Sequence, residues 1–95
     1  MSLFEQMGNI GGEISRALAA RARGDELLEA GALDRALELF DLTAADPRLR
    51  TRLREIMRAR EVVCDYFFGD NEYGSTAESL DSYFLQFAMA ARLSR

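Results

Sequence analysis

Apolar side chains recur at every third or fourth position along most of this chain of 95 residues. That spacing collects them on one side of an α-helix, which has 3.6 residues per turn. The β-branched residues that favour strands are scarce, with three Ile, two Val and three Thr, and there is a single Pro. A sheet protein would need more of them. The sequence therefore predicts an all-α fold.

Short segments that favour helix ends divide the chain into four expected helices. Gly24 and Asp25 combine a helix stop with an N-cap, and Asp46 followed by Pro47 forms the sharpest boundary. We expect helices over residues 3–23, 25–45, 47–68 and 76–93. Because the connections between them are short, neighbouring helices should run antiparallel in a compact bundle that makes residues 1–95 one domain.

The last connection, residues 69–74, is rich in turn-forming residues and contains Tyr73. Ser75 and Glu78 follow it with the spacing of a capping box, which favours a helix start there.

Glycine leaves two points open. Gly31 lies either inside one long helix or between two short ones. In the first helix, one stripe consists of small residues: Gly8, Gly12, Ser15, Ala19 and Ala22. That stripe would let another helix approach closely, or else the glycines would fray the N-terminus.

Helical spacing also predicts which sides are buried. For the second helix, the expected core side holds Leu27, Ala30, Leu33, Leu37, Phe40 and Ala44. For the third, it holds Leu49, Leu53, Ile56, Met57, Val63, Cys64 and Phe67, while Val62, Tyr66 and Ala59 lie on a second apolar side. For the last, it holds Leu80, Tyr83, Phe84, Phe87, Ala88 and Ala91. Arg60 falls within the core side of the third helix, so we expect an ion pair with an acid of a neighbouring helix.

Three apolar residues lie on the opposite side of the last helix. Leu85, Met89 and Leu93, called here the Leu-Met row, are spaced four residues apart. An apolar row on an outer face is usually covered, and a second copy of the chain is the simplest cover. We therefore expect a homodimer, with a protein partner met through this row or through the loop around Tyr73.

Basic residues are concentrated in one segment, although the whole chain has a net charge of −4. Residues 48–60 contain six Arg and one acid, Glu55. Arg50, Arg54 and Arg58, called here the Arg row, are spaced four residues apart and could grip phosphates or an acidic protein. No aromatic residues interrupt this row to stack on bases, so a nucleic-acid partner ranks behind a protein.

Two pairs of acids resemble the metal-binding residues of all-helical nucleotide pyrophosphohydrolases of the MazG kind. They are Glu26 with Glu29 and Glu38 with Asp41. The resemblance implies Mg²⁺-dependent hydrolysis of nucleotides. Only eight residues separate Glu29 from Glu38, which is too few for a helix reversal that turns both pairs inward.

Two further stretches resemble known helical families. Residues 60–67 resemble the Arg-x4-His motif of the HEPN family, with Arg60 kept and Asp65 where that family has His; the chain has no His, which implies a catalytically silent relative. Residues 24–47 resemble a single tetratricopeptide unit. That second resemblance is carried by Gly24, Leu27, Gly31, Ala36, Phe40 and Pro47, and it implies a helical hairpin that binds protein and divides at Gly31.

Taken together, these patterns predict a small non-catalytic protein-binding or adaptor domain that self-associates. We assign no catalytic residue, no metal ligand and no cofactor. Cys64 is the single cysteine and has no partner for a disulfide. Because no apolar run approaches the ~18 residues of a membrane span and no leader pattern opens the chain, we expect a cytoplasmic protein without a membrane partner.

Overall fold

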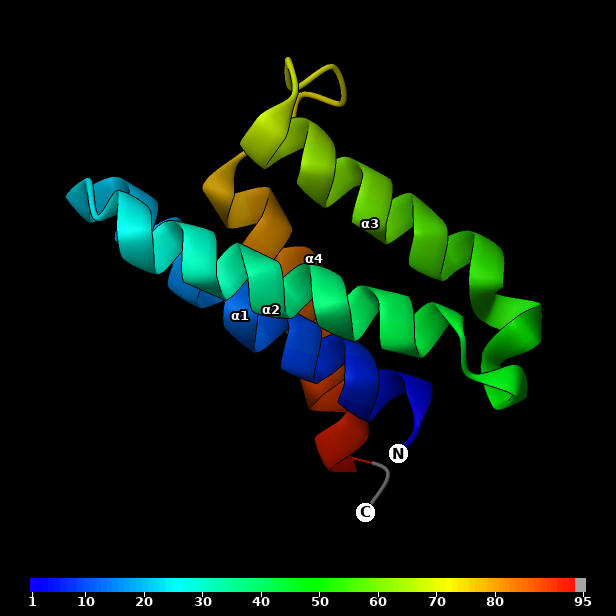
Figure 1. The fold of residues 1–95 in the computed structure, drawn as a ribbon. Helices are drawn as coiled ribbons and strands as arrows, with labels where there is room; N and C mark the ends of the chain where they lie inside the picture. Colours follow the sequence, from blue (N-terminus) through cyan, green and yellow to red (C-terminus); the bar gives the residue numbers. More distant parts are fainter. Residues whose placement is uncertain (94–95) are drawn as a thin grey trace.

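The computed structural model describes residues 1–93, and these residues form a bundle of helices (Figure 1). In chain order the elements are α1 (Leu3–Arg23), α2 (Glu26–Ala44), the short 3-10 helix η1 (Pro47–Arg52), α3 (Leu53–Phe68) and α4 (Ala77–Leu93). No strand occurs within residues 1–93, which confirms the all-α prediction. Over the same residues, no helix combines the length and the apolar character needed to cross a membrane.

α1 starts with a complete cap. The hydroxyl of Ser2 accepts a hydrogen bond from the backbone N–H of Glu5, and the carboxylate of Glu5 accepts one from the N–H of Ser2. This reciprocal capping box satisfies two N–H groups that a helix start leaves without partners. The alternative of a frayed N-terminus is therefore wrong.

α1 lies between α2 and α4 and packs along both (Figure 1). At its end Gly24 adopts a left-handed conformation with φ +74°, and the carboxylate of Asp25 accepts the N–H of Leu28, so the chain reverses at once into α2. The buried core draws on all four α-helices, with α4 contributing Leu80, Phe84 and Phe87. Its largest fully buried side chains include Met7, Ile10 and Ile14 of α1, Phe40 of α2 and Ile56 and Val63 of α3.

Glycines let α1 approach α4, although not all at the positions expected. A Cβ atom on Gly8 would lie 3.3 Å from Cα of Ala88, and one on Gly11 would lie 2.5 Å from Cβ of Phe84. Gly12, which belongs to the expected stripe, has open space beside it. The close contact therefore runs through Gly8 and Gly11, because α4 crosses α1 on the side where those two residues lie.

α2 is one continuous helix that passes through Gly31 without a break. Its buried residues are Ala32, Leu33, Ala36, Phe40 and Thr43. The prediction was wrong for Leu27 and Ala30, which are exposed. Both lie near the start of α2, and the side that faces α1 is the one that carries Ala32 and Ala36.

The sequence predicts one regular helix over residues 47–68, but the structure has two elements there. Asp46 and Pro47 start it as expected, since the carboxylate of Asp46 accepts the N–H of Arg48. Residues Pro47–Arg52 wind as a 3-10 helix with a kink at Leu49, where φ is −107°. The α-helical part, α3, begins at Leu53. It runs at an angle to α2 and ends near the start of α4 (Figure 1).

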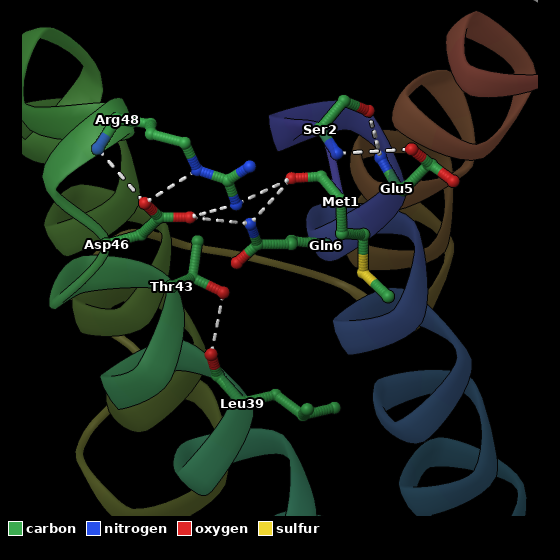
Figure 2. A network of polar contacts seen from close by, with 8 residues as sticks. All are labelled: Met1, Ser2, Glu5, Gln6, Leu39, Thr43, Asp46 and Arg48. Carbon is green, nitrogen blue, oxygen red and sulfur yellow. Dashed lines mark hydrogen bonds and ion pairs between the residues drawn. The ribbon is translucent and has the colours of Figure 1, made fainter.

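A polar network fastens this kinked segment to the start of α1 (Figure 2). The carboxylate of Asp46 accepts hydrogen bonds from the guanidinium of Arg48, at 2.8 Å and 3.1 Å, and from Nε2 of Gln6 at 3.2 Å. The backbone carbonyl of Met1 accepts from both Gln6 and Arg48. These donors, first among them Arg48, hold the pKa of Asp46 well below its usual range. The network thereby ties the start of η1 to the start of α1.

Candidate functional site

One side of α3 carries apolar side chains that the rest of the domain leaves uncovered. Met57 is 45% exposed, Phe68 is 63% exposed and Leu53 is 39% exposed, while Cys64 is half-buried. Leu53, Met57, Cys64 and Phe68 are called here the apolar stripe. They lie four, seven and four residues apart, which keeps them on one side of the helix.

The stripe corrects the predicted core side of α3. Ile56 and Val63 of that side are buried as expected, whereas Leu53 and Met57 are exposed and Cys64 is half-buried. The third buried residue, Ala59, comes from the second apolar side. α3 is apolar over more than half of its circumference, so its periodicity alone allows two inward orientations. Contact with α2 buries the part of the predicted side that carries Ile56 and Val63 and leaves the apolar stripe exposed.

Three residues of the stripe, Met57, Cys64 and Phe68, line a shallow, open hollow whose rim is polar. The hollow is lined by Arg54, Met57, Arg58, Arg60, Glu61, Cys64, Asp65, Phe68 and Gly69. All of these residues belong to α3 or follow it directly, so the hollow is a feature of one helix face.

On the edge toward α2, Arg60 closes the hollow. Its Nε donates a hydrogen bond to Oδ1 of Asp41 at 3.1 Å, and its Nη1 lies 3.9 Å from Sγ of Cys64. The expected ion pair with an acid of a neighbouring helix is confirmed. The side chain of Arg60 is only partly buried, so it spans the edge of the surface and does not enter the core.

The opposite edge carries two members of the predicted Arg row together with two acids, Glu61 and Asp65. Arg54 and Arg58 are exposed, and both line the hollow. Nε of Arg58 lies 3.9 Å from the carboxylate of Glu61, and its guanidinium lies 5.9 Å from the ring centroid of Tyr73. Arg50 is exposed on η1, one residue after the kink at Leu49. The structure thus brings Arg54, Arg58 and Tyr73 to one surface.

The loop after α3 holds Tyr73 beside this surface. The carboxylate of Asp65 accepts hydrogen bonds from the backbone N–H groups of Glu72, at 2.8 Å, and Tyr73, at 3.1 Å. A hydrogen bond to Glu61, together with partial desolvation and the negative charges nearby, raises the pKa of the Tyr73 hydroxyl. Sequence reasoning missed the role of Asp65, because its partners are backbone groups seven and eight residues away and no spacing rule marks them.

A second clasp closes the same loop. Asn71, at φ +53°, exchanges two side-chain hydrogen bonds of 2.9 Å with the backbone of Ser75. The capping box of α4 is formed by Thr76 and Ser79, and the predicted pairing of Ser75 with Glu78 is wrong. Ser75 is unavailable as a cap because its backbone is held by Asn71.

The Leu-Met row lies on a different surface. Leu85, Met89 and Leu93 are exposed along α4, as expected from their spacing. Leu85 borders a shallow hollow between α4 and α1, near the hydrogen bond from Ser15 to Asp81 at 3.0 Å. This hollow shares no lining residue with the one on α3.

The four acids of the pyrophosphohydrolase-like pattern all lie on α2. Glu26 and Asp41 are 15 residues apart on one helix, which corresponds to about 22 Å at 1.5 Å per residue. Glu29 lies 3.6 Å from Nη1 of Arg21, and Asp41 pairs with Arg60, while Glu38 is exposed. Within residues 1–93, no three His, Cys, Asp or Glu side chains converge on one point.

The comparisons with known proteins identify no relative. No protein-family model, no curated protein and no solved structure matches this chain.

Proposed function

We propose that this chain is a non-catalytic protein-binding or adaptor domain that self-associates. The observation that carries the proposal is the apolar stripe, since Met57 and Phe68 are exposed to solvent on one side of α3. Contiguous exposed apolar side chains with a polar rim are typical of protein interaction sites. Fully burying a Met or Phe side chain contributes about 1.5–3 kcal/mol, so a partner that covers the stripe gains substantial free energy.

The polar groups around the stripe fit a binding surface. Arg60 is engaged by Asp41, and Asp65 is engaged by the loop, so both hold the edges of the hollow in a fixed position. Arg54 and Arg58 remain at the rim, where a forked guanidinium suits carboxylates of a protein partner. A rim of this kind favours orientation and association rate, while the apolar centre supplies affinity.

Self-association and location complete the proposal. The domain forms homodimers, and the exposed side chains that would be covered are those of the apolar stripe or of the Leu-Met row. We assign the domain to the cytoplasm, where a lone thiol such as Cys64 stays reduced.

The experiment compares the same substitution on the two surfaces. The full chain, tagged and immobilised, is incubated with an extract of its source cell, alongside Met57→Glu and Met89→Glu. A charge on the stripe should reduce capture of the bound protein by roughly tenfold or more, because a carboxylate would be buried without a partner. If Met57→Glu captures the same protein in the same amount as the unchanged chain, the stripe is not the binding site. Loss in Met89→Glu alone would assign binding to the Leu-Met row.

Anion binding by the Arg row is a second candidate, favoured by the six Arg against one acid in residues 48–60. Phosphate contacts by Arg release counterions, so binding should weaken steeply between about 50 mM and about 200 mM salt. Fluorescence anisotropy with a single-stranded oligonucleotide tests this for the unchanged chain and for a triple variant, Arg50→Ala with Arg54→Ala and Arg58→Ala. Equal, salt-insensitive affinity in both proteins contradicts anion binding.

A further inference from the structure

The outer side of α4 carries acids at one end, apolar side chains in the middle and an Arg at the other end. In chain order these exposed residues, called here the α4 face, are Glu78, Asp81, Leu85, Met89 and Arg92. At about 100° per residue they fall within about 80° of one another, on the side opposite the buried residues of α4. The α4 face therefore contains two residues of the Leu-Met row, with opposite charges on either side of them.

These charges lie at nearly equal distances from the midpoint between Leu85 and Met89. At about 1.5 Å per residue, Asp81 lies about 9 Å from that midpoint toward the start of α4, and Arg92 lies about 7.5 Å from it toward the end. Glu78 adds a second acid one turn further out than Asp81. The pattern of charge is therefore inverted when the direction along α4 is reversed.

The charged groups of the α4 face keep capacity for further hydrogen bonds. Oδ1 of Asp81 accepts a hydrogen bond from the hydroxyl of Ser15 at 3.0 Å, which holds the carboxylate in place. An ionised carboxylate has two oxygens and can accept further donors beside that one. Over residues 1–93, no ion pair engages Glu78, Asp81 or Arg92.

The charges of α1 beside this face follow the reverse order. α1 runs antiparallel to α4, so its first turn lies beside the last turn of α4 (Figure 1). Glu5 of that first turn lines the same shallow hollow as Arg92. At the other end, Arg16 follows Ser15, the residue that is bonded to Asp81. Each end of the surface thus carries an acid on one helix and an Arg on the other.

We propose that a second copy of this chain covers the α4 face, with the two α4 helices antiparallel and a two-fold axis that crosses α4 between Leu85 and Met89. This rests on the self-association in the proposed function, and it leaves the apolar stripe for a different protein. Rotation about this axis sets Leu85 of each copy level with Met89 of the other. It also reverses the direction along α4, so Arg92 of each copy comes within about 1.5 Å of the level of Asp81 of the other.

The paired charges also lie on the same flank of the face. Asp81 contacts α1 through Ser15, and Arg92 lines a hollow together with residues of α1, so both lie on the flank toward α1. A two-fold axis that crosses the helices within the interface places this flank of one copy against the same flank of the other. Glu5 of each copy then lies toward Arg16 of the other, so the charges of α1 do not oppose the arrangement.

Charge complementarity selects a second copy in this orientation. A two-fold interface repeats each contact, so the pair of Asp81 with Arg92 forms twice, around an apolar centre made of Leu85 and Met89 from both copies. A two-fold axis along α4 would keep each residue at its own level and place Asp81 against Asp81 and Arg92 against Arg92, which opposes association. A different protein would not require the two charges to be equally spaced about the apolar pair.

The experiment reverses the two charges separately and together in the full chain. Asp81→Arg and Arg92→Glu each change one end of the α4 face, and the double variant carries both substitutions, which leaves the net charge at −4. Two controls at exposed positions, Asp34→Arg on α2 and Arg54→Glu on α3, make the same changes in net charge away from this face. Circular dichroism checks that each variant remains helical, and sedimentation velocity over a range of concentrations gives the dissociation constant of the dimer.

Either single variant should raise the dissociation constant by roughly tenfold or more, because like charges then meet at two symmetric places. The double variant should dimerise about as tightly as the unchanged chain, because the reversed charges attract each other again. An equimolar mixture of the two single variants should form a heterodimer for the same reason, and both controls should dimerise as the unchanged chain does. Met89→Glu should abolish the dimer, since a carboxylate would be buried without a partner.

Two results with the charge variants would overturn the inference. If both single variants dimerise as tightly as the unchanged chain, no charge pairing occurs across this axis. If the single variants weaken the dimer but the double variant does not recover, Asp81 and Arg92 do not meet each other.

Further results separate the inference from the proposed function. If Met57→Glu disrupts the dimer and Met89→Glu does not, the second copy covers the apolar stripe, so the inference is wrong and the proposed function stands. A chain that is monomeric at every concentration, with capture of another protein still abolished by Met57→Glu, overturns self-association and keeps the stripe as a binding site. A dimer that follows the charge pattern, with capture unchanged in Met57→Glu, supports the inference and overturns the role of the stripe.

Discussion

Gly11 of α1 lies directly against Phe84 of α4, so closely that a Cβ atom on Gly11 would come within 2.5 Å of the Cβ of Phe84. Real Cβ atoms do not approach so closely, and the group in the way sits at the base of a buried side chain. Gly11→Ala should therefore push α4 away from α1 and lower the free energy of unfolding by about 1–3 kcal/mol. Urea unfolding followed by circular dichroism measures the loss.

The neighbouring glycine supplies the matched control. Gly12 lies in the same helix and has open space where a Cβ atom would go. Gly12→Ala should raise the free energy of unfolding by about 0.5–1 kcal/mol, because alanine loses less backbone entropy in a helix. If both substitutions shift stability in the same direction by the same amount, α1 and α4 do not pack as described.

The buried carboxylate of Glu13 should make the stability of the fold sensitive to acid. The Glu13 side chain is buried between α1 and α2, where it is bonded to Arg16 and, at 2.7 Å, to Nε of Arg35. Desolvation would raise the pKa of Glu13, but the two guanidinium groups outweigh it and lower the pKa below the ordinary value of 4.5. Since the folded-state pKa is lowered, the ionised Glu13 stabilises the fold above about pH 4.5, and this contribution is lost as the pH falls below that value.

Glu13→Gln tests whether the ionised carboxylate stabilises the fold. At pH 7 the variant should be less stable by about 1–2 kcal/mol, a modest value because both Arg partners are largely exposed. The difference should shrink when unfolding is repeated near pH 3. Glu26→Gln, at an exposed position, serves as the control and should change little at either pH. A difference that stays constant between the two pH values contradicts the role given to Glu13.

Asp65 should control the order of the loop that carries Tyr73. Its carboxylate accepts the N–H groups of Glu72 and Tyr73, and Asp65→Ala leaves both donors without a partner in the protein. Hydrogen exchange at these two amides should accelerate by about tenfold or more, which corresponds to roughly 1.4 kcal/mol of local stability. Asp70→Ala, an exposed neighbour in the same loop, should leave their exchange unchanged. Equal exchange in both variants would show that Asp65 does not hold the loop.

A substitution at Gly31 tests whether α2 is one long helix or two short ones. Gly31 lies inside the helix without a positive φ, and a Cβ atom there would meet only the end of the Arg35 side chain at 3.6 Å. Gly31→Ala should therefore stabilise the protein by about 0.5–1 kcal/mol, measured by thermal or urea unfolding. A chain that turned at Gly31 in a left-handed conformation would instead be destabilised by alanine, and that result would contradict a continuous α2.

Local signals were sufficient for the helices themselves. The helical spacing of apolar residues, the N-cap at Asp25, the helix stop at Gly24 and the Asp46-Pro47 boundary are properties of a few adjacent residues. The chain responds to them in the same way whatever surrounds it. For this reason the four expected helices agree with the structure to within a residue or two at most ends. The 3-10 winding of residues 47–52 is the exception, and it lies beside the network that joins Asp46 to the start of α1.

The sequence by itself determined that this chain is helical and where most of its helices begin and end, because those features depend on backbone bonds and spacings within a few residues. Only the tertiary structure decided how much of the apolar side of α3 is buried, which glycines touch α4 and what Asp65 holds. The first two depend on how one helix is oriented against another, and that orientation is set by contacts between residues far apart in the chain. A helix such as α3, apolar over a wide arc, has no local signal for which part of that arc is covered, so the exposed stripe could be recognised only once α2 was in place beside it.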